Sequence, residues 1–226
     1  LQFGVQLPAV WRVAPGMLDD QANMAKAALA LYETTGASAY LARARALADA
    51  AERFHWDPAG GGYFFTASDA PGLIARTKHP HDNAVPAGNA TMAQVLARLG
   101  WLTGERRYLD RAEATVAAFS GEVARNVFPL ASLLNAAELI ARPLQVAIIG
   151  AREDPATDAL LRALAGVSAP NLVSSVVAPG AKLPDVHPAR GKGQIAGRPT
   201  AYVCEGPVCS APVTDPAALA EELRRR

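Results

Sequence analysis

The ten-residue stretch TGASAYLARA at residues 35–44 returns as TGERRYLDRA at residues 103–112. Six of the ten positions are identical, and a Met-Ala pair stands at the same distance before each copy, at residues 24–25 and 92–93. Internal similarity at a fixed interval indicates a repeated structural unit. The sequence therefore predicts an array built from copies of one motif.

Each copy has the pattern of two helices joined by a short turn. A helix over residues 18–34 is followed by Gly36, which suits the left-handed cap that ends many helices. The next helix places apolar residues on one face at steps of three and four, and its counterpart in the second copy does the same. These positions are Tyr40, Ala44, Leu47, Ala51 and Phe54 in the first copy, and Tyr108, Ala112, Thr115 and Phe119 in the second.

A further helix is predicted over residues 128–141, with no partner helix after it. A single helical hairpin cannot cover its own apolar face, so such hairpins stack on neighbours. We therefore predict a mainly α fold over residues 1–142, as part of an α/α array whose other members precede Leu1. The chain begins without a methionine or a leader pattern, and we expect it to start at a cut.

The pattern changes at Pro143. A β-branched run at residues 145–149 precedes a predicted helix over 155–165, and further strands are expected at 171–177 and 201–204. A closing helix is expected from Pro216. Alternation of strand and helix predicts a small α/β module with a short parallel sheet over residues 143–226.

Composition narrows the range of partners. The net charge is +1 and 19% of residues are charged, so nothing attracts the chain as a whole to nucleic acid or to an anionic membrane. No apolar stretch is long enough to span a bilayer. Two cysteines do not make a disulfide scaffold. These features predict a cytoplasmic protein.

Two adjacent carboxylates, Asp19 and Asp20, open the first predicted helix. Carboxylates at this position stabilise the helix dipole and accept hydrogen bonds from free amides, which is their ordinary role. In a cleft, one of them could instead act as a general acid or base. Neighbouring side chains on a helix point in different directions, so at most one is expected to face the interior of the array.

The loop at residues 78–89 holds the densest set of functional side chains in the chain. Three of them, His79, His81 and Asp82, could be metal ligands, but their spacing matches no standard site, and no metal is expected. A polar pocket that uses Asp82, Asn83 and Asn89 is the favoured interpretation.

Aromatic residues flank the turn at residues 57–62 in a predicted β-hairpin. Trp56 and Tyr63 could stack on a sugar, although such residues more often pack a loop against helices.

The tail has two further features to weigh. Gly150 follows a strand and precedes a helix, but no glycine-rich fingerprint surrounds it, so no nucleotide cofactor is expected. Four residues lie between Cys204 and Cys209, which is too many for a thioredoxin-type pair. A turn between them would allow a reversible disulfide. In a reducing compartment, unpaired thiols are the expected state.

Four segments, taken together and in order, resemble one known family. They are residues 18–22 (LDDQA), 60–64 (GGGYF), 86–89 (PAGN) and 201–213 (AYVCEGPVCSAPV). This combination resembles the YyaL-like thioredoxin-domain family of the spermatogenesis-associated type. The resemblance implies a thioredoxin-like domain followed by a six-hairpin α/α toroid, similar to N-acylglucosamine 2-epimerases and six-hairpin glycosidases. The chain would then be a C-terminal fragment that lacks the thioredoxin domain and the first part of the toroid.

The resemblance also implies which polar residues face the toroid interior. By matching position these are Asp19, Asp20, Asp82, Pro86, Gly88 and Asn89. The chain departs from the family pattern at Gln21, Asn83, Ala87 and Ala90, where the family usually has Tyr, Gly and two Ser residues. The loss of three hydroxyl groups would change the ligand or abolish activity.

Two functions follow as hypotheses. The first is a carbohydrate-active toroid, an epimerase, isomerase or hydrolase, in which Asp20 and Asp82 transfer protons to a small-molecule ligand. Its substrate-binding residues would be Asp19, His81, Asn83, Asn89, Trp56 and Tyr63. The second is a non-catalytic scaffold for the thioredoxin-like domain of a longer chain, with Cys204 and Cys209 exchanging disulfides with that domain.

Overall fold

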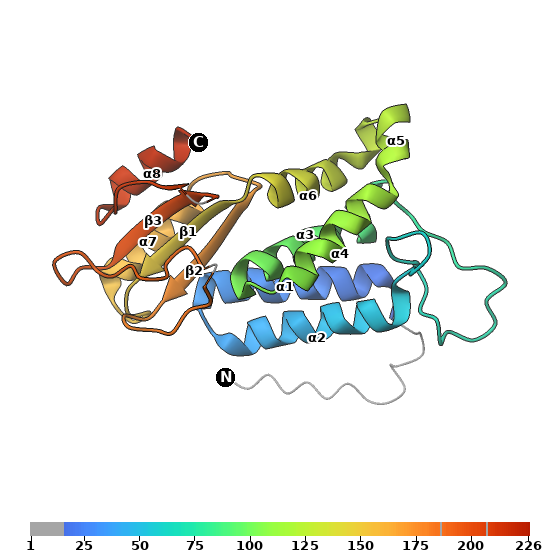
Figure 1. Cartoon of the computed structure of the whole chain (residues 1–226), viewed down its shortest axis with the longest axis horizontal. Helices are drawn as coiled ribbons and strands as arrows, with labels where there is room; N and C mark the ends of the chain where they lie inside the picture. The colour runs from blue at the N-terminus through green and yellow to red at the C-terminus, as the bar shows by residue number, and fades with distance from the viewer. Residues whose placement is uncertain (1–15, 186, 207) are drawn as a thin grey trace.

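The computed structural model describes residues 16–185, 187–206 and 208–226, and residues 1–15 of the predicted array lie outside them. The helices of residues 18–141 gather at one end of the molecule, and the strands lie at the other end together with the last two helices (Figure 1). About half of the described residues are helical, and the strands form one four-stranded sheet. The prediction of a mainly α chain with a small α/β part is confirmed at this level.

The two predicted hairpins are present. The first consists of α1 (Leu18–Thr35) and α2 (Ser38–His55), and the second of α3 (Gly88–Thr103) and α4 (Arg106–Ala118). The first helix of each hairpin ends at a glycine in the left-handed conformation, Gly36 at φ 70° and Gly104 at φ 74°. Positive φ costs glycine little, which explains why the glycine recurs in both copies.

Helix α3 lies at the centre of the helical part. Nearly every residue from Gly88 to Leu102 is buried, because α1, α4 and α6 (Ala131–Ala141) all pack against it. Its small residues let the neighbours come close: a methyl group at Gly100 would lie 2.6 Å from Leu109 Cγ of α4. The burial of α3 on all sides therefore depends on its alanine and glycine residues as much as on its large apolar residues.

The predicted helix over 128–141 begins differently from the expectation. Its first turn is a 3₁₀ helix, η2 (Phe128–Leu130), and α6 follows directly. A short helix that the sequence did not predict, α5 (Ser120–Arg125), precedes it. Helix α6 packs on α3, where Trp101 Nε1 donates to the carbonyl of Leu139 at 3.2 Å.

The sheet is mixed, so the prediction of a parallel sheet is only partly correct. Its strands are β1 (Leu144–Ile149), β2 (Leu172–Val177), β3 (Thr200–Glu205) and β4 (Val208–Cys209), in the order β2-β1-β3-β4. Strands β1 and β2 are parallel through the crossover helix α7 (Pro155–Ala165), whereas β3 returns antiparallel to β1. The long connection at residues 178–199 permits this reversal, and it carries no periodic signal from which direction could be predicted.

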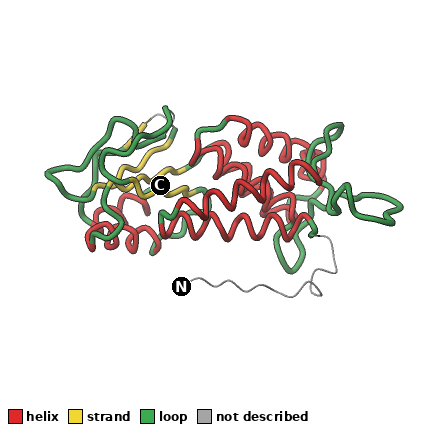
Figure 2. Tube along the Cα trace, turned by 90° about the horizontal axis from the view of Figure 1, so that it is seen from below, coloured by secondary structure: helices red, strands yellow, loops and turns green. Residues whose placement is uncertain are grey.

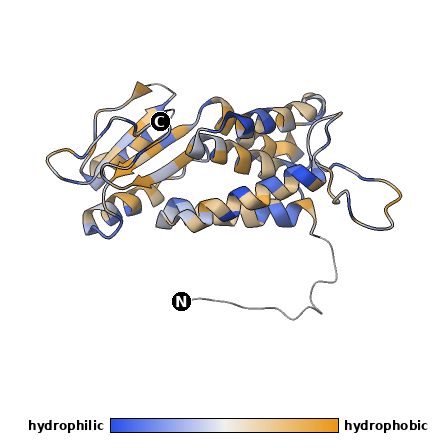
Figure 3. Ribbon diagram, turned by 60° about the horizontal axis from the view of Figure 1, so that its bottom comes forward, coloured by the Kyte–Doolittle hydropathy of each residue, from blue (hydrophilic) through white to orange (hydrophobic). Residues whose placement is uncertain are grey.

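Both faces of the sheet are covered. One face packs on α7 and on α8 (Pro216–Arg224), which also contact each other. The other face, with Ala147, Ile149 and Tyr202, is covered by the connection that includes Leu183 and Ala189. Hydrophobic colour is accordingly concentrated along the strands in Figure 3.

The helical and sheet-containing parts touch each other. Helix α6 ends at Ala141 and β1 begins at Leu144, which is where the sequence pattern changes. Val173 of β2 belongs to the apolar core of the helices. Figure 2 shows the yellow strands lying next to the red helices, and β2 contacts α1 and α3. A division into domains at residues 142 and 143 stays a prediction, as does a closed toroid. Within the described residues, no helix combines the length and apolarity that crossing a bilayer requires.

Candidate functional site

Three of the four motif segments converge at the end of the bundle where α1 and α3 begin. The amide of Leu18 donates to the carbonyl of Phe65 at 2.9 Å. Asn89 of α3 binds the backbone of Tyr63 twice, because its Oδ1 accepts from the Tyr63 amide at 2.7 Å and its Nδ2 donates to the Tyr63 carbonyl at 2.9 Å. The aromatic turn is thereby fixed between the two helix N-termini.

Asp19 meets the first turn of α3 at Gly88. A methyl group at position 88 would lie 2.0 Å from Asp19 Oδ1, so the Asp19 carboxylate lies directly against the backbone of Gly88. Only glycine permits this approach without displacing the carboxylate. The free amides and the dipole of the α3 N-terminus favour a negative charge at this point.

A cavity of about 260 Å³ opens beside this contact. It is lined by Asp19, Phe65, His79, His81, Asn83 and the loop residues Val85, Pro86, Ala87 and Gly88. The His79 ring lies edge-on to Phe65 with centroids 5.4 Å apart, and its Nε2 is 2.9 Å from Thr77 Oγ1. The cavity therefore combines one apolar ring face with a carboxylate, two imidazoles and an amide.

The electrostatics of Asp19 differ from those of an exposed carboxylate. Burial raises the pKa of Asp19 above its ordinary value, and the charge of Asp20 adds to the rise. The charge of His79 and the hydrogen bond from Gly88 act in the opposite direction. A carboxylate under these opposing influences, beside an imidazole, is suited to accept and return a proton.

The two carboxylates predicted to be catalytic do not line this cavity. Asp20 is exposed and accepts from the amide of Met17 at 2.9 Å, so it caps its own helix. Asp82 accepts from the amide of Ala87 at 2.9 Å and from that of Ser132 at 2.8 Å, which ties the starts of α3 and α6 together. Both carboxylates thus accept hydrogen bonds from backbone amides near helix N-termini, which is an ordinary structural role.

The predicted aromatic ligands also lie elsewhere. Tyr63 is fully buried, and its hydroxyl donates to Glu52 at 3.3 Å. The Trp56 ring packs edge-on against Tyr63 at 5.1 Å, and the guanidinium of Arg111 lies 4.2 Å from its centroid. These rings hold the loop against α2 and α4, so a stacking role for them would require the loop to move.

Of the other predicted ligands, His81 and Asn83 line the cavity, whereas Asn89 is buried and holds Tyr63. Sequence reasoning missed Phe65 as a lining residue and considered His79 only as a metal ligand. Within the described residues, no three His, Cys, Asp or Glu side chains gather as they would around a metal ion.

A second hollow, of about 300 Å³, lies between α2 and α4. Its charged side chains bind each other: Arg107 donates to Asp49 at 2.9 Å and Arg111 to Glu52 at 2.8 Å. These interhelical pairs leave few polar groups available for a ligand. The hollow is therefore a weaker candidate than the cavity at Asp19.

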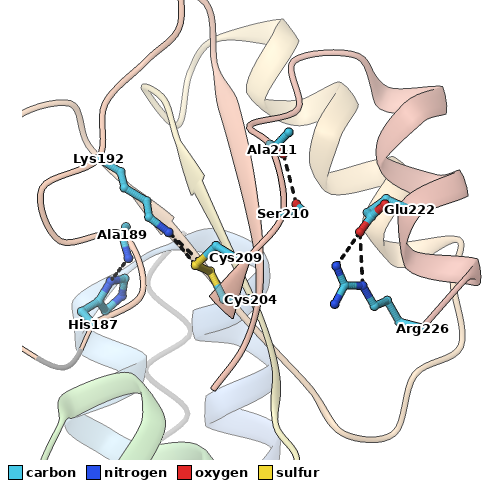
Figure 4. Close-up of a disulfide and its surroundings, with 9 residues drawn as sticks. All are labelled: His187, Ala189, Lys192, Cys204, Cys209, Ser210, Ala211, Glu222 and Arg226. Carbon is cyan, nitrogen blue, oxygen red and sulfur yellow. Dashed lines mark hydrogen bonds and ion pairs between the residues drawn. A yellow bond between two sulfur atoms is a disulfide. The ribbon is translucent and has the colours of Figure 1, made fainter. Parts of the chain in front are cut away.

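The two cysteines form a disulfide, so the expectation of unpaired thiols is wrong for this structure. The reason is the register of the sheet, which places Cys204 of β3 directly opposite Cys209 of β4. The turn between these strands contains Gly206 at φ 55°, while Pro207 lies outside the described residues. Figure 4 shows the disulfide with the side chain of Lys192 directed at it.

No protein-family model matches the chain, but comparison with known proteins finds similar sequences. The chain is 33% identical to human "Spermatogenesis-associated protein 20" over 225 residues, which is 96% of the chain. It is 31% identical over 227 residues to each of the mouse and rat proteins of the same name. The chain spans about 28% of the length of these relatives.

Proposed function

We propose that the cavity where α1 and α3 begin binds a small polyhydroxylated ligand of the carbohydrate class, with Asp19 and His79 as a proton-transferring pair. The observation that carries the proposal is the position of Asp19. Its partly buried carboxylate meets the N-terminus of α3, beside an imidazole, in an open cavity. Titratable groups with perturbed pKa values in a cleft are typical of functional sites.

The lining residues have chemistry that suits a sugar. Phe65 offers an apolar ring of the kind that packs on the C–H face of a pyranose, and the side chains of His81 and Asn83 can donate to or accept from hydroxyl groups. Asp19 and His79 can exchange roles as base and acid, which an epimerase or isomerase requires. Proton transfer is thus assigned to Asp19 and His79, in place of Asp20 and Asp82.

The proposal includes a longer protein. The resemblance to YyaL-like proteins supports a toroid whose remaining hairpins would complete the wall of the cavity, with a thioredoxin-like domain as a further partner. The relatives are long enough to contain such additional parts, since the chain matches about 28% of their length. Binding by the 226-residue chain is accordingly expected to be weak but specific to the cavity.

Substitution of Asp19 tests the proposal. Asp19→Asn removes the charge and keeps the shape, whereas Asp20→Asn makes the same change one residue away on an exposed cap. Glucose, mannose and N-acetylglucosamine are titrated into the 15N-labelled chain and amide shifts of residues 79–88 are followed. Loss of a charge-assisted hydrogen bond is expected to weaken binding about tenfold in Asp19→Asn, with no change in Asp20→Asn.

Three results would overturn the proposal. One is the absence of saccharide-dependent shifts in the wild-type chain, another is equal affinity of the wild type and Asp19→Asn, and the third is equal loss in both variants. Circular dichroism of each variant separates loss of binding from loss of folding.

A further inference from the structure

The Cys204–Cys209 disulfide lies beside a lysine. Lys192 Nζ is 2.6 Å from Cys209 Sγ and 3.5 Å from Cys204 Sγ (Figure 4). The same ammonium lies 4.9 Å from the centre of the Tyr202 ring. A structural disulfide in a sheet needs no cation at its sulfurs, whereas a thiolate released from it is stabilised by one.

The two sulfurs differ in accessibility. Cys204 on β3 is completely buried, whereas Cys209 on the two-residue strand β4 is partly exposed. Exchange occurs by attack of a thiolate on a disulfide sulfur, so access decides which sulfur is attacked. Of the two cysteines, Cys209 is therefore the one nearer to solvent.

Charged residues close in sequence to Lys192 and Cys204 pair with other groups. Arg190, two residues before Lys192, pairs with Asp185, and Glu205 pairs with Arg226 at 3.5 Å. Among the described residues, only Lys192 donates hydrogen bonds to the two sulfurs.

Two more titratable groups adjoin this region. Burial lowers the pKa of His187 below its ordinary value, which keeps that imidazole neutral near pH 7. Burial also lowers the pKa of Lys192, so its proton is held less tightly than that of an exposed lysine. An ammonium of this kind can stabilise a thiolate or give it a proton.

We propose that Cys204 and Cys209 form a thiol–disulfide exchange site for a dithiol reductant, in which Cys209 is the sulfur attacked and Lys192 stabilises the thiolates that are released. This site is separate from the cavity at Asp19 and does not depend on the carbohydrate proposal.

The exchange has two steps. A thiolate of the reductant attacks Cys209 Sγ, a mixed disulfide forms, and the bond to Cys204 breaks with Cys204 leaving as a thiolate. The second thiol of the reductant then attacks its own sulfur in the mixed disulfide and releases Cys209. In sum, the reductant loses two electrons and two protons and becomes a disulfide, and the protein gains two thiols. In the reverse direction, the accessible Cys209 thiolate is the nucleophile.

A single-thiol variant isolates the role of Lys192. In Cys204→Ser, the rate of alkylation of Cys209 by iodoacetamide is measured against pH. We expect the Cys209 thiol to titrate below the ordinary value of about 8.5, and Lys192→Met to raise its pKa by about one unit, a tenfold change in ionisation. Lys182→Met is the matched control, because Lys182 lines the same neighbouring hollow as Lys192, whereas the hydrogen bonds to the sulfurs come from Lys192.

A second measurement keeps both cysteines. The native chain is equilibrated at pH 8.5 with mixtures of reduced and oxidised dithiothreitol, and the reduced fraction is measured by mass spectrometry after acid quenching. A thiol pKa shift of one unit predicts a reduction constant about fivefold lower in Lys192→Met, and no change in Lys182→Met. Equal constants in the two variants, or reduction of the native chain only after unfolding in urea, would overturn the proposal.

Discussion

Gly88 is the residue that lets α1 and α3 meet. A methyl group there would fall 2.0 Å from Asp19 Oδ1 and 3.2 Å from Leu18 Cδ2, so the carboxylate has to turn away. We predict that Gly88→Ala lowers the free energy of unfolding by about 1–3 kcal/mol through overpacking. It should also weaken saccharide binding as Asp19→Asn does, because Asp19 loses its position.

Gly121 of α5 is the matched control for this change. Nothing lies within 4 Å of a methyl group at that position. Gly121→Ala is therefore expected to leave the unfolding free energy unchanged or to raise it by up to about 1 kcal/mol. Urea denaturation measures both variants, and equal stability of Gly88→Ala and the wild type would contradict the contact.

Two buried histidines make stability depend on pH. Burial lowers the pKa of His55 and of His187 below the ordinary value, which is about 6.5 in an unfolded chain. The unfolded chain therefore binds more protons below that pH. The unfolding free energy should be constant above about pH 6.5 and fall below it, by up to about 1.4 kcal/mol per pH unit for each histidine.

Replacement of His55 tests this dependence. His55→Gln is expected to reduce the acid slope between pH 6.5 and 5. Urea midpoints at several pH values give the slopes. An identical slope in the wild type and His55→Gln would show that His55 binds a proton as readily in the folded chain as in the unfolded chain.

At the scale of elements, helices were predictable and strand direction was not. The apolar spacing around Tyr40 and Tyr108 is local information. The faces predicted over residues 40–54 and 108–119 end within two residues of the ends of α2 and α4. The direction of β3 depends on a long connection without a pattern, and β4 has two residues. Neither leaves a signal in the spacing of side chains.

The site was predictable only in part for a similar reason. The motif segments could be named from the sequence, and three of the four do converge through the bonds of Asn89 and the contact of Asp19 with Gly88. Which of two adjacent aspartates turns inward depends on a tertiary contact, so the sequence could not distinguish Asp19 from Asp20. The same applies to Asp82, whose two amide partners come from separate helices.

One ion pair joins three elements. Arg98 of α3 donates to Glu33 of α1 at 2.9 Å and to the carbonyl of Leu172 in β2 at 2.6 Å. Burial raises the pKa of Glu33, and Arg98 opposes this rise. Arg98→Met leaves a mostly buried carboxylate without its partner, and we predict a loss of about 2–3 kcal/mol of unfolding free energy.

The control for this substitution is an exposed pair. Arg106 bonds Asp110 at 2.7 Å with 65% of the arginine side chain exposed, so Arg106→Met should cost at most about 0.5 kcal/mol. Denaturation curves compare the two. Similar small losses in both variants would mean that Arg98 does not hold the helices to the sheet.

At the scale of the whole molecule, apolar side chains remain exposed where η2 begins. Phe128 is 88% exposed and the preceding Val127 is 41% exposed. Exposed apolar groups promote association when they lie together. We predict that the chain self-associates with rising concentration and that Phe128→Ser reduces this association.

Sedimentation velocity at increasing concentration checks the prediction. Val208→Ser is the control, because Val208 is an exposed apolar residue, at 68%, in the sheet-containing part. An equal reduction in both variants would point to general hydrophobicity, and a monomer at all concentrations would contradict the role of Phe128.

The order of the strands also decides how the sheet ends at its two margins. The edge formed by β2 contacts α1 and α3. At the other edge, the segment from Val208 to Val213 pairs with β3 through the backbones of Val203 and Ala201. An unpaired margin is where sheets of separate molecules join into aggregates. The disulfide holds this segment against β3 at Cys209. Reduction of the disulfide would therefore weaken the pairing that prevents the β3 edge of one molecule from pairing with a strand of another. Oxidation state and solubility would then be coupled in this chain.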